Sequence, residues 1–293
     1  MPATRLLLLF LTIGTVFTTP LNAGRASPVP PASALPPALN AWCNQLSHDL
    51  KSVHLGRCEK HGWKFDITST GGRPIPYLYW GKDPATPPSA EQEPRRVLIF
   101  GAMHGDEISA VSAVFRWIDF LERTKPDSFL RQHVYMFFPL VNPDGFYATP
   151  RSRTNSAGVD INRNFSTKEW NEQATLFWKK KASGDPRRFP GPKAASERET
   201  QVVEKAINEF KPDLIISVHA PYSLVDHDGP IAFPEMQSPL PIRTLGAYPG
   251  SLGTYAGIER NIPVVTPELP NARQLPEGKA IEQLFIFIMK SKF

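Results

Sequence analysis

Two features are absent from this chain of 293 residues, and each absence excludes a class of protein. No segment after residue 23 approaches 18 uninterrupted apolar residues, so no membrane span is expected in the mature protein. The formal net charge is +5, but no block of Lys and Arg interleaved with aromatic residues is present. A nucleic-acid partner is therefore not expected.

Cysteine is scarce, since only Cys43 and Cys58 occur. Two thiols are too few for a metal site built from cysteine alone. In an exported chain such a pair usually forms a disulfide, and a loop of about 15 residues gives about 3 kcal/mol of stabilisation in the chain-entropy model. We expect a Cys43–Cys58 bridge that holds the N-terminal segment and has no catalytic role.

The first 23 residues have the pattern of a signal peptide. Arg5 is followed by an apolar run over residues 6–17, and the small residue Ala23 ends the segment. A run of about a dozen apolar residues is too short to span a bilayer comfortably. We expect cleavage after Ala23, with Ala26 as the alternative, and hence an exported protein, periplasmic or secreted. An uncleaved anchor or a buried helix is the other interpretation of this segment.

The remainder of the chain is expected to form one domain. Residues 27–37 are rich in proline, which fixes φ and lacks a donor N–H, so a linker is predicted over residues 24–40. The composition is 41% hydrophobic and 21% charged, which excludes disorder throughout. Residues 41–293 lie within the size range of one large α/β domain.

From Val97 onwards, continuous apolar runs alternate with helical patterns. This alternation is typical of a sheet covered by helices on both faces, and it predicts an α/β fold with a mixed, mostly parallel central sheet. Ligands bind beyond the carboxyl ends of the strands in such sheets. Strands are predicted at 97–100, 134–141, 214–218 and 262–266, helices at 38–50, 108–121, 196–210 and 280–289, a hairpin at 63–80, and an exposed loop at 83–93.

Groups that can bind a metal follow the ends of two predicted strands. His104 and Glu107 come after the strand at 97–100, and His219 ends the strand at 214–218. Two histidines, one carboxylate and an open fourth position are the usual arrangement of a hydrolytic zinc. A His-x-x-Glu pair also arises easily by chance, so a hydrogen-bonded histidine beside a helix cap is the alternative. We predict one zinc ion per chain.

A zinc hydrolase also needs a base that is not a metal ligand. Glu268, at the end of the last predicted strand, is the best-placed carboxylate, and a surface glutamate in a proline-rich turn is the alternative. Residues 151–165 place arginine and asparagine side chains where neither a strand nor a helix is expected. They form either a solvated loop or a site in which arginine grips a carboxylate or stabilises an oxyanion.

Several separate motifs, in order along the chain, resemble the zinc carboxypeptidase family of the carboxypeptidase A type. The resemblance runs roughly over residues 70–289 and implies that family's fold, with a zinc peptidase domain over residues 41–293. The motifs are His104-Gly-Asp-Glu107, Asn142-Pro-Asp-Gly145, Arg153-Thr-Asn155, Gly158-Val-Asp-Ile-Asn-Arg-Asn-Phe165, Ser196-Glu-Arg-Glu199, Ser217-Val-His219, and Tyr248-Pro-Gly-Ser-Leu-Gly253 ahead of Pro267-Glu268-Leu.

Carried over residue by residue, the resemblance implies a role for each candidate. Zinc is implied on His104, Glu107 and His219, with Glu268 as general base and then as proton donor to the leaving amine. The other implied roles are carbonyl polarisation by Arg153, binding of the substrate's terminal carboxylate by Asn162 and Arg163, orientation of the first zinc histidine by Asp160, and a mobile tyrosine near Tyr248.

Within the family, the chain is most similar to bacterial enzymes that cleave murein peptides. The similarity implies hydrolysis of the γ-D-Glu–diaminopimelate bond in a peptidoglycan-derived peptide, by a monomer or a small homo-oligomer. The alternatives are an acyl-amino-acid deacylase of the desuccinylase type, another carboxypeptidase of the family, and a non-catalytic peptidoglycan-binding module. The sequence departs from the family at Glu197-Arg198, where Glu-Pro is usual, and its segment before Thr70, with the two cysteines, has no clear counterpart in the murein-peptide enzymes.

Overall fold

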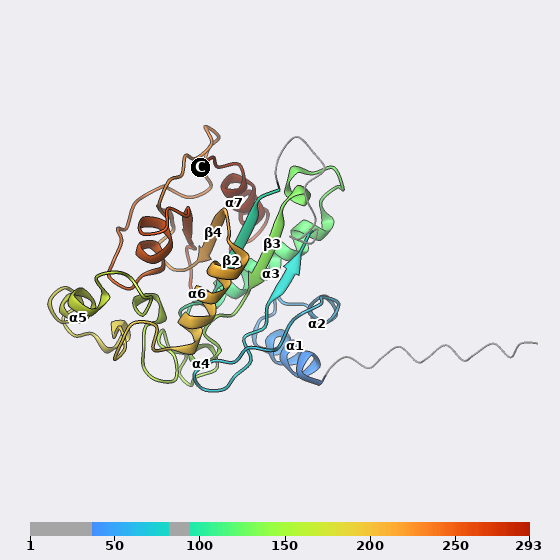
Figure 1. Ribbon diagram of the computed structural model, residues 1–293. Helices are drawn as coiled ribbons and strands as arrows, with labels where there is room; N and C mark the ends of the chain where they lie inside the picture. Colours follow the sequence, from blue (N-terminus) through green and yellow to red (C-terminus); the bar gives the residue numbers. More distant parts are fainter. Residues whose placement is uncertain (1–36, 82–93) are drawn as a thin grey trace, which may run out of the picture. The chain divides into compact units, whose positions relative to one another are not determined.

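A six-stranded mixed sheet forms the centre of the described part of this computed structural model, which is residues 37–81 and 94–293 (Figure 1). The strand order is β1-β3-β2-β4-β6-β5. The four central strands run parallel, and β1 and β5 pair antiparallel at the two edges. The strands are β1 (Leu78–Trp80), β2 (Arg96–Gly101), β3 (Val134–Phe138), β4 (Leu214–Val218), β5 (Leu224–Asp228) and β6 (Val264–Glu268). The predicted α/β class with a mixed, mostly parallel sheet is confirmed.

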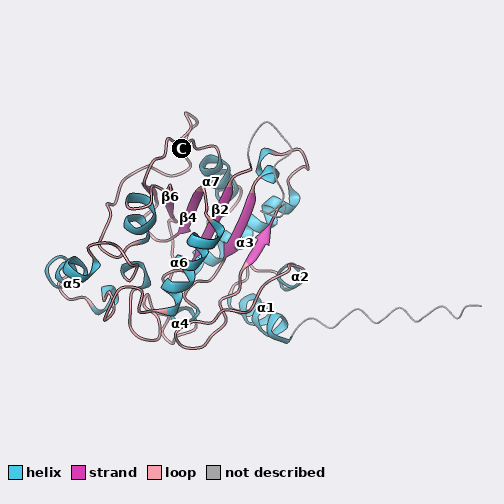
Figure 2. Ribbon diagram, viewed as in Figure 1, coloured by secondary structure: helices cyan, strands magenta, loops and turns pink. Residues whose placement is uncertain are grey.

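Helices cover both faces of the sheet because successive residues of each central strand point to opposite faces. In β2, Val97 and Ile99 pack with α3 (Ile108–Arg123) and α7 (Ala280–Met289) on one face. Leu98 and Phe100 pack on the other face with α6 (Arg198–Phe210) and the π-helical segment η5 (Gly253–Ile258). Figure 2 shows α6 on the near side of the strands and α3 on the far side. None of the helices in the described residues is long and apolar enough to cross a membrane.

The remaining helical elements precede β1 or lie in the connections between strands. The α-helical ones are α1 (Pro37–Asp49), α2 (Leu55–Glu59), α4 (Pro143–Phe146) and α5 (Thr175–Lys181), and the others are η1 (Phe129–Gln132), η2 (Ile161–Arg163), η3 (Trp170–Ala174) and η4 (Pro186–Arg188). Helix α1 begins within the expected linker, so residues 37–40 are helical. The expected signal peptide, the rest of the linker and the expected loop at 83–93 lie outside the described residues.

Some predicted elements differ in their bounds. Strand β3 ends at Phe138, because Pro139 has no N–H to donate to the ladder. The hairpin expected at 63–80 contains only two isolated bridges, Lys64 with Tyr77 and Thr68 with Pro74, before β1. Strand β5 was not predicted, because its polar residues interrupt the apolar pattern that marks the other strands.

The predicted disulfide is present and joins α1 to α2, with an S–S distance of 2.05 Å. Cys43 and Cys58 are both fully buried. Trp42 and Trp63 pack beside them with ring centroids 5.0 Å apart, and both rings contact Phe115 of α3. The bridge therefore ties α1 to α2, and the two tryptophan rings pack this pair of helices against α3.

We expect loss of this bridge to lower the free energy of unfolding by about 3 kcal/mol, because closing a loop of about 15 residues restricts the unfolded chain. The measurement is urea denaturation followed by tryptophan fluorescence, for the wild type with and without reductant and for the Cys43→Ala/Cys58→Ala double variant. The reduced wild type is the control, because it keeps both side chains and lacks only the bond. Equal stability of the oxidised and reduced proteins would contradict the prediction.

Candidate active site

All of the predicted site residues meet at one edge of the sheet. Because β2, β4 and β6 are parallel neighbours, the residues at or after their carboxyl ends lie side by side. These residues line a cavity of about 550 Å³. The lining includes His104, Glu107, Arg153, Asn162, Arg163, His219, Tyr248 and Glu268.

The three predicted metal ligands face one another. The Nδ1 atoms of His104 and His219 lie 3.1 Å apart. Glu107 lies between the two rings, with Oε1 2.7 Å from Nδ1 of His104 and Oε2 2.8 Å from Nδ1 of His219. All three residues are buried, and their ligand atoms lie within 4.8 Å of one another.

Asp160 fixes the state of the first histidine. Nε2 of His104 lies 3.2 Å from Oδ1 of Asp160, so the ring donates its Nε2 proton to this carboxylate. In that tautomer the lone pair that a metal needs is on Nδ1, which faces Glu107 and His219. A metal-binding histidine usually makes this kind of hydrogen bond with its second nitrogen, so the donor set fits zinc in chemistry as well as in number.

Charge compensation keeps the carboxylates around this centre ionised. Burial alone would raise the pKa of Glu107, but the two histidines hold it well below its usual range. Burial alone would also raise the pKa of Asp160, but Arg153, and to a smaller extent His104, hold it well below its usual range. Arg153 donates from both Nε and Nη2 to Oδ2 of Asp160, at 2.9 Å each. The Arg153 guanidinium is therefore fixed beside the candidate metal centre, with Nη1 3.1 Å from Nδ1 of His104.

The Asn-Pro-Asp-Gly motif connects two of the site loops. The Asn142 side chain accepts from N–H of Gly145 at 2.8 Å and caps α4, and it donates to the carbonyls of Met103 and Arg153. Gly105 must be a glycine, because a Cβ there would lie 2.2 Å from the carbonyl carbon of Gly145. The motif thus positions the His104 loop and the Arg153 loop against each other, rather than acting only as a turn.

A buried polar network explains the Ser-Glu-Arg-Glu motif. The Asn155 amide donates to Glu197 at 2.7 Å and to Glu199 at 3.2 Å, which anchors the loop that carries Arg153. Arg198 takes the family's usual proline position, the first residue of α6, where an N–H has no partner inside the helix. Here that N–H donates to the Thr70 hydroxyl at 3.2 Å, so the departure from the family pattern has a local compensation.

Glu268 is not a surface residue. It ends β6 with 6% of its surface exposed, and its Oε2 atom has no hydrogen-bond partner among the described residues. Burial raises the pKa of Glu268 above its ordinary value. A buried carboxylate with an unused oxygen, lining the cavity beside the candidate ligands, can take up a proton.

Arg163, Asn162 and Tyr248 form a second part of the cavity wall. The Arg163 guanidinium lies over the Tyr248 ring, 4.7 Å from its centroid, and donates from Nη1 to the Asn162 carbonyl at 2.6 Å. The Asn162 side-chain oxygen accepts from N–H of Leu252 at 2.9 Å. Tyr248 donates its hydroxyl to the carbonyl of Leu245 at 2.9 Å. The structure thus places Tyr248 in the cavity wall, against Arg163.

Sequence reasoning missed several residues that line the same cavity. They are Asp106, Asp185, Arg187, Arg188, Tyr222, Asp226 and Asp228. Asp226 and Asp228 lie on β5, the strand that was not predicted, where the i, i+2 spacing of two aspartates is the one signal available.

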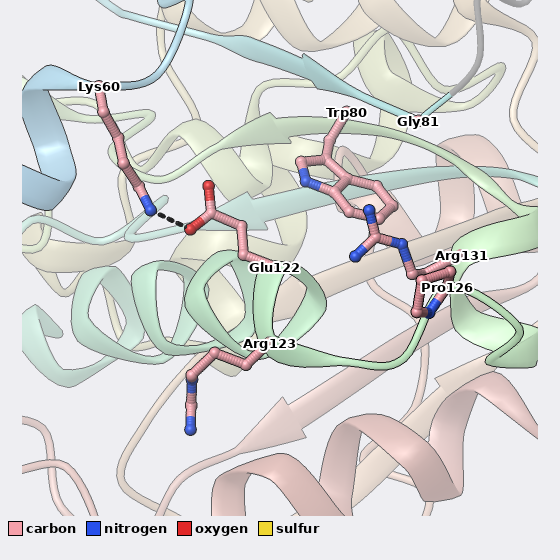
Figure 3. Close-up of a pocket in the computed structure, with 7 residues that line it drawn as sticks. All are labelled: Lys60, Trp80, Gly81, Glu122, Arg123, Pro126 and Arg131. Carbon is pink, nitrogen blue, oxygen red and sulfur yellow. Dashed lines mark hydrogen bonds and ion pairs between the residues drawn. The ribbon is translucent and has the colours of Figure 1, made fainter.

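A larger cavity, of about 790 Å³, lies away from these residues (Figure 3). It is lined by Lys60, Trp80, Gly81, Glu122, Arg123, Pro126 and Arg131. Gly81 packs against His133, which directly precedes β3, so this cavity lies at the amino edge of the sheet. Figure 3 shows Lys60 paired with Glu122 and the Arg131 guanidinium against the Trp80 ring. This cavity of about 790 Å³ lies away from the predicted ligands, and its Lys60 and Glu122 are already paired with each other. The cavity of about 550 Å³ is therefore the candidate site.

Comparison with known proteins agrees with this geometry. A family model described as zinc carboxypeptidase matches residues 64–225, more than half of the chain. Murein peptide amidase A of Escherichia coli strain K12 is 33% identical over 180 residues, which cover 59% of this chain and 70% of that protein. Murein peptide amidase A of Vibrio campbellii is 29% identical over 223 residues, covering 73% and 83%. The structure of carboxypeptidase A from Helicoverpa armigera superposes with a TM-score of 0.57 at 18% identity, covering 85% of this chain and 70% of that one. The chain belongs to the zinc carboxypeptidase family.

Proposed function

We propose that this protein is a zinc metallopeptidase that hydrolyses murein peptides at the γ-D-Glu–diaminopimelate bond and releases the C-terminal residue. The observation that carries the peptidase assignment is that one cavity brings together a His-Glu-His ligand set, fixed arginines and Glu268, whose Oε2 atom has no partner among the described residues. The murein substrate is inferred from the two murein peptide amidases that are similar in sequence.

In this proposal His104, Glu107 and His219 hold the zinc ion. When bound, zinc supplies Lewis-acid polarisation of a carbonyl and activation of water. Glu268 takes a proton from the attacking water at its free Oε2 atom and then delivers it to the amine of the leaving residue. Arg153 lies at the ligand set, where its guanidinium can stabilise negative charge that develops on the carbonyl oxygen.

Arg163 makes the enzyme select substrates with a free C-terminal carboxylate. Its planar guanidinium presents paired donors that match a carboxylate, which the single ammonium of lysine cannot copy. Asn162 lies next to it in the cavity wall. We assign these two residues to the terminal carboxylate of the substrate, with the Tyr248 ring packed against the guanidinium.

The test is incubation of the zinc-loaded mature protein with L-Ala-γ-D-Glu-diaminopimelate and with purified muropeptides, followed by mass analysis of the products. Release of free diaminopimelate supports the proposal. Cleavage inside longer stem peptides would instead indicate an endopeptidase. Release of the acyl group from N-succinyl amino acids, without cleavage of the tripeptide, would indicate a deacylase.

We expect His104→Ala and His219→Ala each to abolish retention of zinc, because two remaining ligands do not complete the site. The measurement is metal content after extensive dialysis, together with the rise in melting temperature when zinc is added to the metal-free protein. His48→Ala is the matched control, since its side chain is 88% exposed and lies outside the cavity. Stoichiometric zinc in the double variant His104→Ala/His219→Ala would contradict the ligand assignment.

We further propose that the protein is exported after removal of residues 1–23. The proposal is supported by the signal-peptide pattern and by the disulfide, because disulfides persist in oxidising compartments. Mass analysis of the protein from cell fractions is the test. A chain that starts near Gly24 and carries the Cys43–Cys58 bridge supports export, and a full-length reduced chain in the cytoplasm contradicts it.

A further inference from the structure

Two buried carboxylates line the candidate active site without any assigned role. Asp226 and Asp228 stand two residues apart on β5, so both side chains leave the same face of this edge strand. They are 6% and 9% exposed and line the cavity that also holds the zinc ligands and Glu268. The carboxylates therefore place negative charge inside the substrate cavity, on a strand separate from the ligand loops.

The two aspartates differ in their partners. Asp226 accepts backbone hydrogen bonds from N–H of Leu245, at 2.9 Å, and from N–H of His227. The Asp228 carboxylate makes no hydrogen bond or ion pair with the described residues. Burial raises the pKa of Asp228 to about 6, and the neighbouring charge of Asp226 adds to this effect. Asp228 is thus a nearly buried acid whose charge nothing in the described part of the chain neutralises.

The chain leaves room for this carboxylate. A Cβ on Gly253 of η5 would lie 2.0 Å from Oδ2 of Asp228, so only glycine allows η5 to approach the strand there. Gly257, one turn later, faces the Cβ of Asp228 in the same way, at 2.6 Å. The two glycines make a space fitted to Asp228, although a carboxylate without a partner is costly to bury.

The arginines of the cavity do not supply the missing partner. Arg153 is held by Asp160, Arg187 is paired with Asp106 at 2.7 Å, and Arg188 lies 3.9 Å from Asp185. Arg163 is stacked on Tyr248. The cavity therefore has a cationic part, formed by these arginines, and an anionic part on β5 that is open to a cation from the ligand.

We propose that Asp226 and Asp228 bind an ammonium group on the side chain of the residue that is released. This inference rests on the proposed function and specifies which class of C-terminal residue the peptidase releases. The released residue carries an amine at the end of its side chain, as diaminopimelate and lysine do, while its terminal carboxylate faces Arg163. A charged hydrogen bond to a buried carboxylate favours the amine-bearing substrate over an analogue that leaves the carboxylate unpaired.

The experiment compares two tripeptides, L-Ala-γ-D-Glu-diaminopimelate and the same peptide ending in 2-aminopimelate, which lacks only the side-chain amine. For the wild type we expect kcat/KM to be about 100-fold higher with the amine present. For Asp228→Asn we expect the ratio of the two kcat/KM values to fall to about one tenth of the wild-type ratio or less, and Asp226→Asn to lower it as well. Asp127→Asn, at an exposed position outside the cavity, is the matched control and is expected to keep the wild-type ratio.

The ratio separates recognition from general damage, because a variant that merely folds poorly loses activity on both peptides alike. Equal rates of the wild type on both peptides would overturn the inference and leave the proposed function intact. If neither peptide is cleaved, the proposed function fails, and the rise in melting temperature with free diaminopimelate decides the inference. A rise that exceeds that with 2-aminopimelate, and that Asp228→Asn abolishes, supports it. An equal rise with both compounds overturns it. A rise with calcium and none with diaminopimelate also overturns it, because the two carboxylates would then bind a divalent cation rather than an ammonium group.

Discussion

Replacing Glu268 with glutamine is expected to lower kcat by about 10²–10⁴-fold, the usual contribution of a general acid–base group. Glutamine has nearly the same shape as glutamate and cannot take up the proton. The Oε2 atom of Glu268 has no partner among the described residues, so the change removes no contact of that atom. Because Glu268 is not one of the clustered metal ligands, zinc content and melting temperature should stay at wild-type values.

The measurement is steady-state kinetics on L-Ala-γ-D-Glu-diaminopimelate, with zinc content determined on the same samples. Glu172→Gln is the matched control, because it makes the same chemical change at an exposed position. An equal loss in both variants would trace the effect to net charge rather than to proton transfer. Turnover of Glu268→Gln at the wild-type rate would show that another group is the base.

The sequence predicted the centre of the candidate site because the carboxyl ends of neighbouring parallel strands lie at the same edge of a sheet. His104, His219 and Glu268 each come at or just after the end of a strand that is marked by a continuous apolar run. Strands buried on both faces carry such runs, and their carboxyl ends meet at one edge. Three strand ends that are far apart in sequence could therefore be placed together before any contact was known.

Other parts of the site left no comparable signal in the sequence. Strand β5 is an edge strand whose Asp226 and Asp228 interrupt the apolar pattern, so the strand was not predicted, and the i, i+2 spacing of the aspartates does not by itself place them in the site. The position of Asp228 also depends on close approach to Gly253, a contact between segments that are distant in sequence. Periodicity describes one segment at a time and does not contain such contacts.

The loop that carries Asn142 also makes long-range contacts that the sequence does not reveal. The Asn-Pro-Asp-Gly motif predicts a local turn, which the capping bond of Asn142 to Gly145 explains. The bonds from Asn142 to the carbonyls of Met103 and Arg153 are long-range, and they could be known only from the folded chain. Local turn chemistry was thus predictable, whereas its use in holding two site loops together was not.

Replacing Arg163 with alanine is expected to lower kcat/KM on the tripeptide by about 10²–10³-fold, mainly through KM, because it leaves the substrate's carboxylate without its charged partner. Arg163→Lys should recover only part of this loss, since lysine keeps the charge but not the paired donors. Arg198→Ala, which removes an exposed arginine, is the matched control. Melting temperatures of all three variants show whether the wall formed with Tyr248 remains folded.

Amidating the C-terminus of the substrate removes the other member of the same pair. The wild type should therefore lose about as much kcat/KM on the amidated tripeptide as Arg163→Ala loses on the free acid. With both changes together the losses should not add, because an interaction that is already absent cannot be lost again. The deciding quantity is the coupling between the two changes, measured with both enzymes on both peptides. Additive losses would place the terminal carboxylate elsewhere in the cavity. Unchanged rates of the wild type on the amidated peptide would show that no free chain end is required, and would redirect the assignment towards an endopeptidase that cleaves within longer stems.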